Sequence, residues 1–144
     1  MNTTHKLEVP LFKADIVFVH HVGWSKFFRQ ILDHYKDAGG FIAYEYGETI
    51  ELEYAKGTTG RVVVTSNKDS EDLLFWFWAK EPEGQGDSDM GWLAHESYHL
   101  VAEILRNAGV KEGAASEEVY AYLLEWVMHK LVGIIWTHEQ ENIS

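Results

Sequence analysis

The sequence predicts an α+β fold, because strand-like segments fill its first half and helical patterns close it. Its 144 residues are typical of one domain, and 46% hydrophobic with 14% aromatic residues are enough to bury a core. No internal repeat and no long linker divides the chain. We therefore expect a single domain over residues 1–144. It would contain a small mixed or antiparallel sheet, an N-terminal helix and two later helices packed on that sheet.

Four segments have the alternation or the β-branched and aromatic content that is typical of strands. They are residues 6–22, 40–57, 60–66 and 71–80. The first is expected to be one strand, or two strands broken near Pro10. The second is expected to be a hairpin that turns at Gly47. The last is apolar throughout its centre, which predicts a strand buried on both faces, or one with a buried face and a ligand face.

Three segments have helical spacing of their apolar residues. The first, residues 23–40, has apolar side chains at 24, 27, 28, 31, 32 and 35 and a stop at Gly39-Gly40. The second covers about residues 89–108 and is stopped by Gly109. The third covers about residues 116–137 and is opened by Ser116.

Charge and composition argue against several functions and locations for this chain. The formal charge is −11 and no basic cluster is present, so we expect no nucleic-acid binding. There is no Cys, and any metal site must use His and carboxylate ligands. We find neither a basic N-terminal region followed by a long apolar run nor ~20 uninterrupted apolar residues. We therefore expect no signal peptide, no membrane span and a cytoplasmic location.

The strongest functional signal is His95-Glu96-x-x-His99 within the second predicted helix. About one shuffled chain in twenty of this composition would contain such a motif by chance. The two histidines lie about 40° apart on a helical wheel, one turn above the other. Both imidazoles can then reach one Zn²⁺ ion, while the adjacent glutamate reaches only the metal-bound water. The pattern predicts a zinc site.

The apolar residues of this helix fall on both sides of the polar stripe that carries His95 and His99. Leu93, Leu100 and Ile104 form one flank, and Ala94, Val101 and Leu105 form the other. This distribution predicts that the histidines lie in a polar groove between two packed flanks. The alternative is an ordinary helix that carries two histidines with other hydrogen-bond partners.

A catalytic zinc site usually has a third protein ligand and an open fourth position. The candidates downstream are Glu117, Glu118, Glu125 and His129. Antiparallel final helices would place Glu125 or His129 opposite His95, and Glu118 opposite His99 or beyond, so spacing alone leaves the choice open. Acidic residues in a first helical turn also complement the helix dipole without any metal.

Two segments carry a resemblance to a known family: LAHESYHLVAEILRNAGV (93–110) and SEEVYAYLLEWVMHKL (116–131). They resemble the zincin-like metallopeptidases of bacteriophages and prophages, which are small relatives of the gluzincins. The matching residues are His95, Glu96, His99, Gly109, Glu117-Glu118 and Ala121-Tyr122-Leu123. The resemblance covers residues 90–136 well and is faint before them. It implies a single zincin-like metallopeptidase domain.

The resemblance also implies roles for individual residues. In gluzincins the third ligand is a Glu of the following helix, often with Ala three residues later, which Glu118 and Ala121 match. His95, His99 and Glu118 would then hold Zn²⁺, and Glu96 would be the general base that activates water for attack on a peptide bond. Tyr122 is the first candidate to stabilise the oxyanion, and Tyr98 is a weaker one.

The substrate implied by the resemblance is a peptide or protein. It would pair with an edge strand before the motif helix, here residues 61–66 or 73–80. Two other functions stay open at this point. The chain could be a zinc-binding zincin scaffold without catalysis that acts as a protein-interaction module. It could instead be an acidic inhibitor or DNA mimic, because its charge is strongly negative. The sequence does not predict the oligomeric state.

Overall fold

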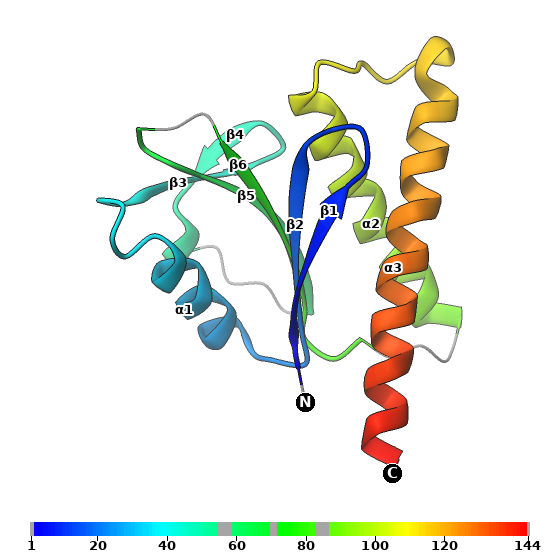
Figure 1. Cartoon of the computed structure of the whole chain (residues 1–144), viewed down its shortest axis with the longest axis horizontal. Coiled ribbons are helices and arrows are strands. Elements are labelled where there is room, and N and C mark those ends of the chain that lie inside the picture. Colours follow the sequence, from blue (N-terminus) through cyan, green and yellow to red (C-terminus); the bar gives the residue numbers. More distant parts are fainter. Residues whose placement is uncertain (1, 55–58, 70–71, 83–86, 144) are drawn as a thin grey trace. The chain divides into compact units, whose positions relative to one another are not determined.

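The computed structural model describes residues 2–54, 59–69, 72–82 and 87–143 (Figure 1). It confirms the α+β class, with a six-stranded mixed sheet and three α-helices in the described part of the chain. Two compact units are present: Thr3–Glu81, and Pro82–Ser144 with Met1–Asn2. The prediction of one domain over residues 1–144, with the later helices packed on the sheet, stays a prediction.

The sheet is formed by strands from the unit of residues 3–81. They are β1 (Thr4–Val9), β2 (Ala14–His20), β3 (Phe41–Glu45), β4 (Glu48–Ile50), β5 (Gly60–Asn67) and β6 (Leu73–Ala79). Their order across the sheet is β1-β2-β6-β5-β3-β4. Only the β2–β6 pair is parallel, and the other four neighbouring pairs are antiparallel. The segment around Pro10 therefore forms two strands, as one of the two sequence alternatives predicted.

The position of β5 and β6 contradicts one expectation. Both strands lie inside the sheet, β6 between β2 and β5, and β5 between β6 and β3. Both of their edges are already hydrogen-bonded to neighbouring strands, so neither can accept an added substrate strand. The prediction that a substrate pairs with residues 61–66 or 73–80 is wrong. The edges of the described sheet are β1 and β4.

Helix α1 (Trp24–His34) packs on one face of this sheet. Phe27 and Ile31 are fully buried in the cluster that it forms with the strands, and Phe27 stacks on Trp78 with ring centroids 5.7 Å apart. The two indole groups of β6 satisfy their N–H donors inside the core: Trp78 donates to the Val22 carbonyl over 2.7 Å, and Trp76 donates to Thr65 Oγ1 over 2.8 Å. Side chains on both faces of β6 are buried, as one of the two sequence alternatives predicted.

The β3–β4 hairpin turns at Tyr46 and Gly47, which confirms the expected turn at Gly47. Both residues have positive φ, 56° and 81°, as a two-residue type I′ turn requires. Glu45 and Glu48 flank the turn as the last pair of the ladder. Glu45 also accepts a hydrogen bond from Arg61 Nη2 over 2.9 Å, which ties the hairpin to β5.

The unit of residues 82–144 contains helices α2 (Asp87–Asn107) and α3 (Glu117–Ile143). They lie side by side and antiparallel (Figure 1). Gly109 ends α2 as predicted: its φ is +80°, the Val110 N–H donates to the Leu105 carbonyl, and the Gly109 N–H donates to the Arg106 carbonyl. This is a Schellman motif, in which glycine adopts the left-handed conformation. Helix α3 runs beyond the predicted end near residue 137.

No helix among the described residues is both long enough and apolar enough to cross a lipid bilayer.

Candidate metal site on helix α2

The motif residues His95, Glu96 and His99 lie in the middle of α2, in regular helix, as the sequence predicted. Because the two histidines are one turn apart, their side chains meet. The imidazole rings contact edge to face, with centroids 4.7 Å apart and planes at 81°. Their Nε2 atoms are 3.1 Å apart. This is a hydrogen-bond distance, at which one imidazole donates to the other, and it brings the two Nε2 atoms close enough to share one ion in place of that bond.

This separation can be compared with the geometry of zinc. Two imidazole nitrogens at ~2.0–2.1 Å from one ion, at a tetrahedral angle, are about 3.3–3.4 Å apart. The observed 3.1 Å between the Nε2 atoms of His95 and His99 differs from this by a few tenths of an ångström. A small rotation of either ring removes that difference. The donor pair thus fits a zinc ion in kind and in spacing.

The surroundings of this pair differ from the predicted groove. His95 is exposed, and Glu96 and His99 are half-buried. The side chains predicted as two flanks form one continuous buried face with Ser97 between them. Buried in that face are Leu93, Ser97, Leu100, Val101, Ile104 and Leu105. The histidines lie on the opposite, open side of α2. The prediction of a groove between two packed flanks is wrong, because both flanks belong to the same side of the helix.

An ion pair ends the polar stripe one turn after His99. Glu103 is only 4% exposed, and its Oε1 accepts a hydrogen bond from Arg106 Nη1 over 2.6 Å. Arg106 keeps about half of its side chain in solvent. The stripe therefore places a buried carboxylate next to the motif, but that carboxylate is already bound to a guanidinium.

The candidate third ligands all lie on α3, and all four are exposed. They are Glu117, Glu118, Glu125 and His129. The buried side of α3 is formed by other residues, among them Tyr120, Leu123, Val127, Leu131 and Ile135. Among the residues that the structure describes, no third His, Asp or Glu has a donor atom within 4.8 Å of both motif histidines. The structure brings His95 and His99 together without a third ligand, and Glu118 in that role stays a prediction.

The two tyrosines considered for oxyanion stabilisation have different environments. Tyr122 is 52% exposed on α3. Tyr98 donates its hydroxyl to the Glu112 carboxylate, and its ring lies 6.3 Å from that of Tyr120. The hydrogen bond to Glu112 is the main cause that raises the pKa of Tyr98 to about 12. The hydrogen bond of Tyr98 thus connects α2 to the loop that follows it. The role of Tyr122 as an oxyanion donor stays a prediction.

A second group of histidines lies in the sheet unit, outside any motif of the sequence. His20 is buried at the end of β2, its Nδ1 lies 2.7 Å from Nδ1 of His21, and its ring stacks on that of His5 at 5.2 Å. Consecutive residues of a strand normally point to opposite faces. His21 meets His20 because its φ is +57°, which ends the strand. No pattern in the sequence marks this conformation.

Family models, curated proteins and solved structures give no match to this chain. The resemblance to the zincin-like metallopeptidases of phages therefore depends on the motif residues themselves.

Proposed function

We propose that the protein is a zinc-dependent peptidase whose metal site is built on His95 and His99, with Glu96 as general base. One observation carries the proposal: the Nε2 atoms of the two histidines are 3.1 Å apart. Zinc peptidases bind their metal through two imidazoles at this spacing on one helix face, with a glutamate directly after the first histidine. The substrate would be a peptide or protein.

The roles of the residues follow from their chemistry. His95 and His99 would hold the ion through Nε2, which requires both rings to be deprotonated at that nitrogen. Bound zinc would supply Lewis acidity, which activates water and polarises a peptide carbonyl. Glu96 would take the proton from the attacking water and pass it to the leaving amine. The exposure of His95 leaves room for an extended substrate next to the pair.

The third ligand is not in place beside the two histidines among the described residues. Glu118 remains our proposed ligand because of its match to the Glu-x-x-Ala pattern. Its carboxylate is exposed and is not gathered with the motif histidines. Ligation by Glu118 would therefore require rearrangement of its side chain, of the α2–α3 pair, or of both.

A second candidate is a zinc-binding scaffold without catalysis that serves as a protein-interaction module. The observation that favours it is the absence of a third donor near the pair in the described part of the chain. An ion held by two imidazoles alone binds weakly, and an open site without a fixed third ligand lacks the preorganisation that catalysis needs.

The experiment that tests the proposal is a peptide-cleavage screen on protein treated with a chelator and then reloaded with zinc. The peptidase proposal expects cleavage that disappears after chelation and returns with about one equivalent of zinc. Zinc binding without any cleavage across broad peptide and protein libraries would favour the scaffold. Cleavage that persists in the chelated protein would contradict a metal-dependent mechanism.

A further inference from the structure

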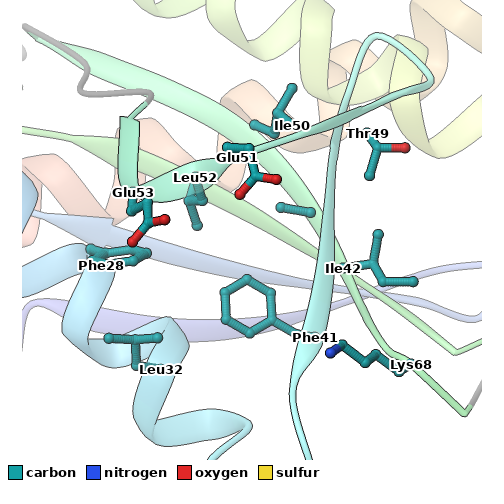
Figure 2. A pocket seen from close by; sticks show the side chains of 11 residues that line it. Phe28, Leu32, Phe41, Ile42, Thr49, Ile50, Glu51, Leu52, Glu53 and Lys68 are labelled. Carbon is teal, nitrogen blue, oxygen red and sulfur yellow. The ribbon is translucent and has the colours of Figure 1, made fainter.

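A cavity of about 430 Å³ lies in the sheet unit, between α1 and the β3–β4 hairpin (Figure 2). Its size is within the range of ligand-binding pockets. Phe28 and Leu32 reach it from α1, and Phe41 reaches it from β3. All three side chains remain partly or largely exposed. The cavity is thus an open site whose lining includes two aromatic rings.

Beside the cavity, part of the β4-facing edge of β3 has no partner strand in the described chain. β4 pairs with β3 only from Ala43 to Glu45, and the chain leaves the sheet after Ile50 to form a 3₁₀ turn at Leu52–Tyr54. Phe41 pairs with β5 on its other side. In an antiparallel ladder, alternate residues direct their N–H and C=O groups to the same neighbour.

The direction of the Phe41 backbone follows from the turn. A two-residue hairpin makes its flanking pair, Glu45 and Glu48, a hydrogen-bonded pair. Ala43 and Phe41 then direct their backbone groups to the same side as Glu45. For Ala43 that side holds Ile50 of β4. On the same side of Phe41 there is no strand of the described chain. The N–H and C=O of Phe41 are therefore open to an added strand.

The charged groups at the cavity indicate the sign of the charge that a ligand would carry. Figure 2 shows the carboxylates of Glu51 and Glu53 on one side of Phe41, and the ammonium group of Lys68 on the other. None of these three side chains forms an ion pair with another described residue. Two carboxylates beside aromatic rings favour a cation with an apolar stem.

We propose that this cavity binds an arginine side chain of an extended peptide whose backbone pairs with Phe41. The peptide residue opposite Phe41 would direct its side chain to the same face of the sheet as the Phe41 ring, which is the cavity face. Its methylene stem would lie against Phe28 and Leu32, and its guanidinium would reach Glu51 and Glu53. Arginine fits better than lysine, because its planar fork binds carboxylates and stacks on rings. This site belongs to the unit of residues 3–81 and does not depend on the metal.

The test is calorimetric titration of the full chain with the peptide acetyl-Thr-Thr-Arg-Thr-Thr-amide at low salt. A peptide with citrulline in place of arginine has the same shape without the charge. We expect the arginine peptide to bind about tenfold more tightly. The double variant Glu51→Gln/Glu53→Gln should lose this preference, and Glu48→Gln, an exposed glutamate of β4 outside the cavity, should keep it. Equal affinity for both peptides, or an unchanged preference in the double variant, overturns the proposal.

The strand pairing is tested separately with two peptides that are N-methylated at alternate residues in opposite phases. Only one phase blocks the amides that face Phe41, so one peptide should lose binding and the other should keep it. Equal binding by both, or binding of N-acetylarginine amide as tight as that of the peptide, would overturn the pairing with Phe41.

Discussion

Two pairs of histidines meet in this molecule by different routes. His95 and His99 meet on α2 because residues four apart in a helix lie one above the other, and their Nε2 atoms are 3.1 Å apart. His20 and His21 meet at the end of β2 because His21 adopts positive φ, and their Nδ1 atoms are 2.7 Å apart. The first pair is on an open helix face, and the second includes a buried ring.

The contact between His95 and His99 is determined by their spacing in the sequence. The contact between His20 and His21 is determined by the backbone conformation of His21. Helical spacing is regular, so the first pair can be read from residue numbers alone. The second pair depends on one residue in a conformation that few non-glycine residues adopt. Our proposal places chemistry at the α2 pair because that pair has an adjacent glutamate and lies on an open helix face.

The largest effect is expected from Glu96→Gln. The amide keeps the shape of the side chain but cannot accept a proton from water. Peptide cleavage should fall by ~10²–10⁴-fold, while zinc content and the unfolding transition stay nearly unchanged. Cleavage rates of wild type and variant on the same substrate, with zinc content as the control, provide the measurement. An undiminished rate in the variant would show that the helix pair does not work as a zincin site.

A second test concerns the ligand that the helix pair lacks. Glu118→Ala should weaken zinc binding about tenfold or more if Glu118 completes the site. Glu117→Ala is the matched control, because it removes an equally exposed carboxylate one residue away and should leave affinity unchanged. Competition titrations with a chromogenic chelator measure both. A larger effect in Glu117, Glu125 or His129 variants would reassign the ligand.

The sheet pair can be tested through its backbone. His21→Val should lower the free energy of unfolding by ~1–2 kcal/mol more than His21→Asn does. Both variants remove the imidazole, but a β-branched residue is strongly disfavoured at positive φ and asparagine is tolerated there. Chemical denaturation of the two variants gives the difference. Equal stabilities would mean that the left-handed conformation of His21 does not constrain the fold.

The smallest effect is expected at Tyr98, beside the helix pair. Its folded pKa of about 12 lies above the ordinary value of 10, so the hydrogen bond to Glu112 stabilises the protein below pH 10. This contribution is lost as the pH rises through about 12. Tyr98→Phe should cost about 0.5 kcal/mol at pH 8, and the exposed Tyr122→Phe should cost nothing measurable. Ultraviolet titration of Tyr98→Phe should show one phenolate fewer near pH 12 than the wild type does. An unchanged titration in this range would contradict the assignment.

The regular elements were predictable because their signals are local. Gly47 and Gly109 mark a turn and a helix end that need positive φ, and the apolar spacing of α1 and the motif spacing of α2 follow from helix geometry. The order of the strands was not predictable in this way. A continuous apolar run identifies β6 as buried but does not say which strands flank it, so the expected substrate edge was placed there wrongly.

The candidate site was predictable only as far as one helix extends. The His95–His99 pair needs α2 alone, whereas a third ligand depends on which face α3 turns toward α2. The helical wheel also could not distinguish two packed flanks from one broad buried face, and the structure has the latter. The cavity beside Phe41 arises because β4 ends at Ile50, opposite Ala43, and leaves the first two residues of β3 without a partner strand on that side. No pattern in the sequence predicts this early end of β4.

The most direct test of the central claim is the zinc content of the purified chain after reconstitution and dialysis. The wild type should retain about one zinc per chain, and the variant His95→Ala/His99→Ala should retain almost none. The matched variant His34→Ala, which removes an exposed histidine of α1, should match the wild type. Zinc near zero in the wild type, or an unchanged content in the double variant, would contradict a metal site on α2.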